Sequence, residues 1–397
     1  MEQSVQNGHK EKPGLRWGFT TGSCAAAAAQ RAAAMALGVR VSPEERIFLR
    51  TPKGIDLSLA MEKPESGEGW ASCAVKKDSG DDPDITNGIL VFAKVTIQSK
   101  GKPLQEEPLP GGEDVQITIT GGEGIGKVTK AGLACSVGEA AINPVPRKMI
   151  LEQVRRVCEE LDFYGKLLVE LTIPEGAELA KRTYNPRLGV VGGISILGTS
   201  GIVEPMSEQA LIDTIKVEMN VRRAAGAEFL VVTPGNYGES FLRKQFKAEQ
   251  FDSVKCSNFI GDALDYAELC GFKGVLLVGH IGKLIKASAG ILNTHSKYGD
   301  ARMEILGVHA ALSGASKSVI EKLLACVTTE EAIAVLDEAE IRTETMLSIL
   351  KKLDFHLKER VHHNLEIGAI LFSNQYGYLG ETEDAVQLRN SILGMGR

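Results

Sequence analysis

The chain of 397 residues lacks several features that mark special classes of protein. Aromatic residues make up only 5% of it, with two Trp, and no apolar run is long enough to span a bilayer. A basic excess is missing too, because the formal net charge is -6, and a nucleic-acid-binding protein would need a positive field. We therefore expect a soluble globular protein with no nucleic-acid or membrane partner. An anionic ligand would need a local group of cations.

Cysteine pairs with C-x-x-C spacing are also absent. The seven cysteines are scattered and odd in number, which argues against a disulfide framework and against a zinc site. Residues 1–13 are polar, with no apolar segment behind their charges, so they do not resemble a secretory signal. We expect reduced thiols, no metal site in the protein and a cytoplasmic location.

The length exceeds what one hydrophobic core usually holds, so we expect two domains. Residues 1–14 are expected to be a disordered tail. Residues 15–186 mix alternating strands with flanking helices, which predicts an α+β domain. Strands and helices then alternate, beginning with an expected strand at Ile194–Leu197. This order predicts a doubly wound, Rossmann-like parallel sheet with a helical C-terminal part in residues 187–397.

Four turns follow the expected strands of this second domain. They are Gly198–Gly201, Thr233–Gly238, Phe259–Ala263 and Gly279–Lys283. In a doubly wound sheet they would lie side by side at the carboxyl edge, where such sheets bind ligands. None of the four turns is specific alone. Together they predict a site for a nucleotide-like or adenosyl cofactor and leave its chemistry open.

The segment 272–302 joins an expected buried strand, Gly274–Val278, to a glycine turn and a polar cluster. Lys283 and Lys286 follow the turn at a helical spacing that would place both amines near one face. The polar run Asn293–Arg302 contains His295, which is either a functional imidazole or a structural one held by hydrogen bonds. The residues alone do not decide between these interpretations.

An alanine-rich stretch, Ala25–Ala36, predicts a thin helix that Ser23 or Thr21 caps and Gly38 ends. Its free N–H groups, beside threonine hydroxyls and Gly22, would suit an anion or a substrate. The alternative is a well-capped helix that serves only for packing.

An acidic loop and a glycine-rich segment add weaker signals. The loop 76–88 holds four aspartates, which could bind a hard cation or could simply be solvated. It lies between expected strands, so it marks the mouth of a sheet. The segment Gly121–Leu133 has glycines spaced as in phosphate-binding loops but lacks the G-x-x-x-x-G-K-[ST] pattern.

Eight segments, taken in chain order, resemble the CbiD family of cobalt-precorrin-5B methyltransferases from anaerobic cobalamin biosynthesis. They include GFTTGSCAAAAA from Gly18, KKDSGDDPDITNG from Lys76, GISILGTSGIVEPMS from Gly193 and GHIGKLIKASAGILNTHSKYGDAR from Gly279. The resemblance covers nearly the whole chain. It implies transfer of a methyl group from S-adenosylmethionine to carbon 1 of a corrinoid ring, with cobalt present only inside the substrate.

The resemblance and the turns together suggest roles for individual residues. We expect S-adenosylmethionine on the strand-end turns, the corrinoid carboxylates between the domains, and a proton acceptor near the ring, although the proton could also leave to solvent. The expected cofactor-binding residues are Gly198, Thr199, Ser200, Gly201, Thr233, Pro234, Gly235, Asn236, Gly279 and His280. The expected substrate-binding residues are Thr20, Thr21, Gly22, Ser23, Lys283, Lys286, Lys297 and Arg302, and the candidate bases are His295 and Asp82.

Two other classes remain open on the sequence. A small-molecule kinase would use the glycines near Gly121 with Asp81 and Asp82, and a tetrapyrrole-binding protein would hold a corrinoid without catalysis. A homo-oligomer and contacts with other enzymes of the cobalamin pathway are compatible with the sequence, which does not decide them.

Overall fold

The computed structural model describes residues 14–42, 44–101, 115–246 and 253–393. The chain divides into two compact units, residues 1–207 and 208–397, which are described separately below. Apart from Gly14, the expected N-terminal tail lies outside the described residues.

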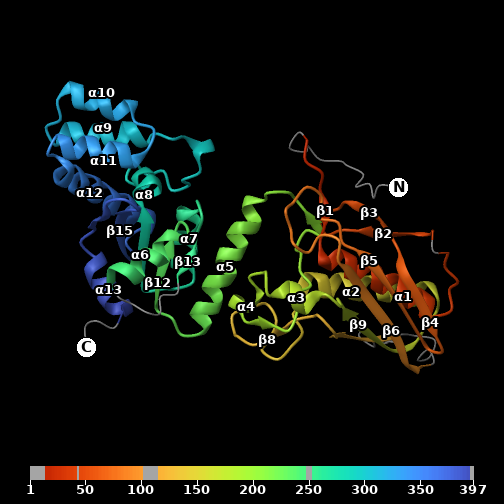
Figure 1. Cartoon of the computed structure of the whole chain (residues 1–397). Helices are drawn as coiled ribbons and strands as arrows, with labels where there is room; N and C mark the ends of the chain where they lie inside the picture. The colour runs from red at the N-terminus through yellow and green to blue at the C-terminus, as the bar shows by residue number, and fades with distance from the viewer. Residues whose placement is uncertain (1–13, 43, 102–114, 247–252, 394–397) are drawn as a thin grey trace. The chain divides into compact units, whose positions relative to one another are not determined.

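The first unit is built on a five-stranded sheet with three antiparallel pairings and one parallel pairing, between β9 and β7 (Figure 1). Two long helices, α1 (Thr21–Ala36) and α2 (Pro144–Glu160), pack against each other, and α1 lies against β5 and β6. In spatial order the strands are β4 (Glu62–Gly67), β5 (Trp70–Lys76), β6 (Leu90–Lys100), β9 (Gly165–Thr172) and β7 (Val115–Gly121).

Helix α1 is thin because of its alanines, and Ala25–Ala29 are fully buried. Such short side chains let the helix backbone approach the sheet closely. The expected alanine helix is confirmed, but its cap is Thr20, whose side chain accepts a hydrogen bond from Ser23 N, and not Thr21 or Ser23.

Shorter pairings complete the first unit. Strand β1 (Gly18–Phe19) pairs with β11 (Ile202–Val203), and β8 (Lys127–Val128) pairs with β10 (Val190–Val191). The remaining elements are the hairpin of β2 (Arg46–Arg50) and β3 (Asp56–Ala60) and the short helices α3 (Gly176–Ala180) and α4 (Asn185–Leu188).

These pairings tie residues 190–203 to the first unit. Ile194 and Ile196 form bridges with Ile125 and Ile142 and are buried in the first unit's core. The expectation that Ile194–Leu197 starts the parallel sheet is therefore wrong. The first unit ends at Ser207, whereas the sequence predicts a domain boundary after residue 186.

The second unit contains a five-stranded, mainly parallel sheet, as expected for the C-terminal half of a mixed α/β chain. Strands β13, β12, β14 and β15 are parallel, and β16 adds an antiparallel edge. In spatial order the strands are β13 (Val254–Lys255), β12 (Phe229–Thr233), β14 (Gly274–His280), β15 (Glu366–Ser373) and β16 (Gly377–Glu381).

Strand β14 is buried on both faces, as its apolar run predicts. Val275 and Leu277 belong to one apolar cluster, and Leu276 and Val278 belong to another. Successive side chains of a strand point to opposite faces, so the two clusters cover the two sides of the sheet.

Helices surround this sheet (Figure 1). Helices α6 and α13 contribute to the cluster of Leu276, whereas α7, α8 and α12 contribute to the cluster of Val275. The helices of the unit are α5 (Glu208–Ala224), α6 (Tyr237–Phe246), α7 (Ile260–Leu269), α8 (Ile281–Ala287), α9 (Arg302–Leu312), α10 (Lys317–Ala325), α11 (Thr329–Glu338), α12 (Arg342–Arg360) and α13 (Ala385–Leu393), with a 3-10 turn, η1 (Ser296–Tyr298).

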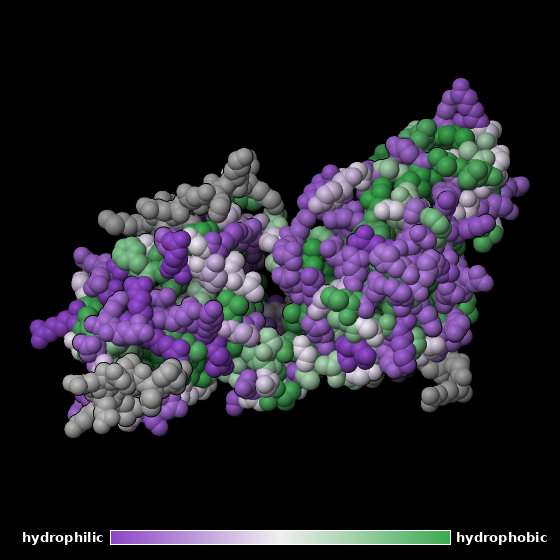
Figure 2. Space-filling view, turned by 180° about the vertical axis from the view of Figure 1, so that it is seen from behind, coloured by the Kyte–Doolittle hydropathy of each residue, from purple (hydrophilic) through white to green (hydrophobic). Residues whose placement is uncertain are grey.

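Hydrophilic residues cover most of the face seen in Figure 2, and hydrophobic residues form smaller areas between them. None of the described helices combines the length and the apolar character needed to cross a membrane.

Candidate functional site

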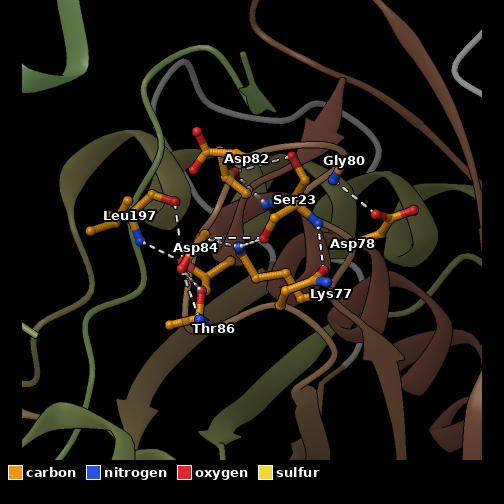
Figure 3. Close-up of polar contacts among 12 residues, drawn as sticks. Ser23, Lys77, Asp78, Gly80, Asp82, Asp84, Thr86 and Leu197 are labelled. Atoms are coloured by element: carbon orange, nitrogen blue, oxygen red, sulfur yellow. Dashed lines mark hydrogen bonds and ion pairs between the residues drawn. The ribbon is translucent and has the colours of Figure 1, made fainter. Parts of the chain in front are cut away.

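Three segments that the sequence singled out converge in the first unit: residues 16–23, 77–86 and 197–206 (Figure 3). Phe19 N donates to Asp78 O over 2.8 Å, and Thr20 N donates to Gly201 O over 3.1 Å. A β-carbon on Gly18 would lie 2.3 Å from the Ser79 carbonyl carbon, so only glycine allows this approach. The motifs are therefore linked through their backbones.

The ammonium of Lys77 forms the centre of the acidic loop. Lys77 is only 3% exposed, and its Nζ donates to Ser79 Oγ and Asp84 Oδ2. Thr86 donates to Asp84 Oδ1 from its N, over 2.8 Å, and from its Oγ1, over 2.7 Å. Burial alone would raise the pKa of the Asp84 carboxyl, but the Lys77 charge and these hydrogen bonds hold that pKa below its usual value. The buried ammonium of Lys77 and the partly buried carboxylate of Asp84 fix the loop from inside.

Arg16 neutralises the outer part of the same loop. Its guanidinium donates to both carboxylate oxygens of Asp78, and its backbone N donates to Asp81 Oδ2 over 2.6 Å. Burial would raise the pKa of Asp78, yet the hydrogen bonds from Arg16 and from Gly80 N hold it low. The loop is therefore internally paired, and the described residues contain no group of three or more His, Cys, Asp or Glu placed to hold a metal ion.

Asp82, one of the two candidate bases, lies in this loop. Its Oδ1 accepts a hydrogen bond from Met206 N over 3.0 Å, and its side chain is partly exposed. Met206 has a φ of 55, a backbone conformation that non-glycine residues seldom adopt. The contact fixes the orientation of the carboxylate, and the role as a base stays a prediction.

The polar groups at the start of α1 bind the segment 195–201. Thr21 Oγ1 accepts from Leu197 N over 3.0 Å, and Gly22 N donates to Leu197 O over 3.0 Å. Ser23 Oγ donates to Gly201 O over 2.7 Å. Thr20, Thr21 and Ser23 are buried. These contacts match the packing interpretation of the helix start, and a contact of these residues with substrate stays a prediction.

The turn Gly198–Gly201 does not belong to the parallel sheet. It lies in the first unit, where a β-carbon on Gly198 would be 2.4 Å from Thr20 Oγ1. Ser200 Oγ accepts from Ile202 N over 3.2 Å, and Thr199 is exposed. The expectation that all four turns share one sheet edge is thus wrong for this turn, because residues 190–203 pair within the first unit.

The turns after β12 and β14 do lie at one edge, because these strands are parallel neighbours. The Thr233 hydroxyl shares a hydrogen bond with Ser253 Oγ, and Asn236 Oδ1 accepts from Lys255 Nζ over 2.9 Å. A β-carbon on Gly235 would meet no atom of the described residues within 4 Å. Space is therefore open directly beside this turn.

His280, at the end of β14, is held by a hydrogen bond on one ring nitrogen. Its Nδ1 accepts from Gly282 N over 3.0 Å. Its buried Nε2 lies 2.9 Å from Glu330 Oε1 but makes no hydrogen bond among the described residues. Ser373 Oγ, at the end of β15, donates to the same Glu330 oxygen over 3.2 Å. Burial would raise the pKa of Glu330, but the hydrogen bond from Thr329 and the nearby His280 keep it below its usual value.

Sequence reasoning did not identify Glu330 or Ser373 as members of this cluster. Two signals could have found them. Ser373 directly follows the apolar run Ile367–Phe372, so it ends a strand, and Thr328 with Glu331 forms a capping box that places Glu330 in the first turn of α11.

Lys283 and Lys286 have different surroundings, although we expected both amines near one face. Lys283 Nζ donates to Pro234 O over 2.7 Å and to Ser257 O over 3.3 Å. Lys286 is 3% exposed, and its Nζ donates to Thr294 O and Gly299 O. Lys283 thus connects the sheet-edge turns, whereas Lys286 fastens the loop that carries His295.

His295 caps η1 and is exposed. Its Nδ1 accepts from Lys297 N over 3.1 Å, and no contact of Nε2 appears among the described residues. Lys297 pairs with Glu208, and Arg302 pairs with Asp300. These contacts show a structural function for the imidazole, and its role as a base stays a prediction.

The glycine-rich segment near Gly121 is explained by close packing. A β-carbon on Gly124 would lie 1.7 Å from Ile173 O, and one on Gly126 would lie 2.3 Å from Val190 Cγ1. The glycines therefore allow backbones to approach, and their spacing gives no support to a phosphate-binding loop.

Comparison with known proteins covers almost the whole chain. Residues 8–205 match CbiD, and residues 293–383 match the CbiD C-terminal domain. The chain is 48% identical to the cobalt-precorrin-5B C(1)-methyltransferase of Ruminiclostridium cellulolyticum over 93% of this chain and 91% of that protein. It is 40% identical to the protein of the same name from Alkaliphilus metalliredigens, over 98% and 97%.

A crystal structure of the cobalamin biosynthesis protein CbiD from Archaeoglobus fulgidus is 29% identical and aligns over 76% of this chain and 86% of that one, with a TM-score of 0.37. The matched segments include the convergent loops of the first unit and the helices that follow His295 in the second. The chain belongs to the CbiD family.

Proposed function

We propose that this chain is a cobalt-precorrin-5B C(1)-methyltransferase, which moves a methyl group from S-adenosylmethionine to carbon 1 of cobalt-precorrin-5B in cobalamin biosynthesis. The observation that carries the proposal is the 48% identity, over nearly the full length of both chains, to a protein of that name. The products would be cobalt-precorrin-6A and S-adenosylhomocysteine. Cobalt enters only within the corrinoid, which is the small-molecule partner.

We assign the first unit to the α+β class and the second to the doubly wound, Rossmann-like class. The chain leaves β12 through α6 on one face of the sheet and leaves β14 through α8 on the other. In sheets of this class, ligands bind at the carboxyl ends of two neighbouring strands whose connections diverge in this way. The turns after β12 and β14 occupy that position.

The methyl donor therefore fits best on Thr233–Asn236, Gly279 and His280. When bound, S-adenosylmethionine supplies a methyl group activated by a sulfonium, and such a displacement depends mainly on alignment. The chain contributes open space beside Gly235 and the imidazole of His280, which accepts a hydrogen bond from Gly282 N. Gly198–Gly201 is left out of this site because it lies in the first unit.

The corrinoid carries several carboxylates and needs cations. Lys297 and Arg302 already pair with Glu208 and Asp300, so they would have to exchange these partners for substrate carboxylates. Both ion pairs are accessible to solvent, where such exchange is inexpensive. The hydrogen-bonding groups at the start of α1 already bind residues 195–201. A role of this helix start in substrate binding would therefore need further donors.

Methyl addition at carbon 1 leaves a proton to be removed from the ring. His295 and Asp82 stay our candidates, since His295 Nε2 and the second oxygen of Asp82 accept nothing in the contacts described above. A base variant, His295→Gln or Asp82→Asn, should lower kcat by about 100-fold with donor affinity kept. If both variants keep the wild-type rate, the proton leaves to solvent.

One experiment tests the proposed function. The protein is incubated anaerobically with cobalt-precorrin-5B and S-adenosylmethionine, and mass spectrometry follows the gain of one methyl group. A corrinoid that binds without being methylated would instead indicate a binding protein. Thermal stabilisation by ATP with Mg²⁺, but not by S-adenosylhomocysteine, would indicate a kinase.

A further inference from the structure

We propose that Lys283 binds the carboxylate of the methionine part of the methyl donor and so selects donors that carry this group. The inference rests on the proposed function, and it assigns one chemical group of the donor to one side chain. Its basis is the position of the ammonium, the charge around it and its unused hydrogen-bonding capacity.

The ammonium of Lys283 lies across the carboxyl ends of three neighbouring strands. Lys283 follows β14, and its Nζ donates to Pro234 O after β12 and to Ser257 O after β13. The amine is thus held at the place where the connections of β12 and β14 diverge, which is where sheets of this class bind ligands.

No carboxylate of the described residues pairs with this ammonium. Among the described residues Lys283 has no ion pair, whereas Lys286 has Asp300 at 3.9 Å and Lys297 has Glu208. Its two partners are neutral carbonyls. The neighbouring Cys256 is also neutral at pH 7, because burial raises the pKa of that thiol to about 12.

The cation is also partly removed from water. Burial lowers the pKa of Lys283 and outweighs the opposing effect of Cys256. Ser257, which supplies one of its carbonyls, has a φ of 54, and such strained backbone is frequent around ligands. A half-buried ammonium with two of its three N–H groups used retains one donor for an anion.

A carboxylate is the group that fits. It is the one anionic group of S-adenosylmethionine, and Gly235, next to the Pro234 that accepts from Lys283, leaves open space beside it. The corrinoid also carries carboxylates, so the experiment must separate these two sources. The position at the diverging strands favours the donor.

The test is a double-mutant cycle measured by calorimetry on the full chain. S-adenosylhomocysteine and its decarboxylated analogue, which keeps the adenosine, sulfur and amine, are titrated into wild type and Lys283→Met. In wild type, loss of the carboxylate should weaken binding about tenfold to a hundredfold, as for a charge-assisted hydrogen bond. In Lys283→Met the two ligands should bind within about twofold of each other.

Lys273→Met is the matched control, because Lys273 precedes β14 at the opposite edge of the same sheet and pairs with Glu228. It should behave like wild type. Lys283→Gln keeps a donor for the Pro234 carbonyl while removing the charge, so it gives the same readout if Lys283→Met does not fold.

Several outcomes would overturn the inference. If the carboxylate contributes as much in Lys283→Met as in wild type, Lys283 is only a tether between two turns. If Lys283→Met keeps its affinity for S-adenosylhomocysteine but loses affinity for the corrinoid, the carboxylate belongs to the substrate. If wild type binds no S-adenosylhomocysteine, the proposed function itself fails.

Discussion

The two units use their charged groups in different ways. In the first unit Lys77 is paired with Asp84 and Arg16 with Asp78, so the motif charges satisfy one another. At the sheet edge of the second unit Lys283 contacts two carbonyls and, within the described part of the chain, no anion. A motif dense in polar residues can thus serve to hold a loop, whereas a single unbalanced charge indicates where a ligand belongs.

The largest expected effect comes from breaking the buried pair of the first unit. Lys77→Met leaves Asp84 partly buried without its counter-ion. We therefore expect the free energy of unfolding, measured by urea denaturation, to fall by about 3 kcal/mol. Lys76→Met changes an exposed neighbour and should alter it by less than about 0.5 kcal/mol. Equal stability of the two variants would mean that the pair does not hold the loop.

A second change tests the close approach of Gly198 to Thr20. Gly198 has a φ of 127, and a β-carbon there would clash with the Thr20 side chain. Gly198→Ala should therefore lower the free energy of unfolding by about 2 kcal/mol. Gly192 also has a positive φ, 83, but none of the described atoms lies within 4 Å of its β-carbon position. Gly192→Ala should therefore lower the free energy of unfolding by only about 1 kcal/mol, because of backbone strain. A loss as small in Gly198→Ala would rule out the clash.

A smaller effect should appear in acid. The pKa of Asp84 is lower in the folded protein than its usual value of 3.8, so this carboxylate stabilises the fold above that pH. The contribution should disappear as the pH falls below 3.8 through the folded-state pKa. In Asp84→Asn the free energy of unfolding should accordingly decrease less steeply with falling pH in this range. Urea unfolding at successive pH values measures this slope. An unchanged slope would contradict the pairing.

Sequence reasoning identified the parts of this molecule that depend on local pattern. The apolar run of β14 and the alanines of α1 predicted their own elements, because burial on both faces and small side chains leave clear signatures. The place of Gly198–Gly201 could not be predicted, since it depends on the pairing of β1 with β11, residues far apart in the chain. Glu330 reaches His280 through the same kind of long-range contact.

Gly235→Val tests whether the sheet edge of the second unit binds the methyl donor. A β-carbon at Gly235 would meet no atom within 4 Å in the part of the chain that the structure describes, so valine should fill ligand space without disturbing the fold. We predict that calorimetry will show at least about a tenfold loss of affinity for S-adenosylhomocysteine, with the melting temperature unchanged. Wild-type affinity in Gly235→Val would contradict the claim.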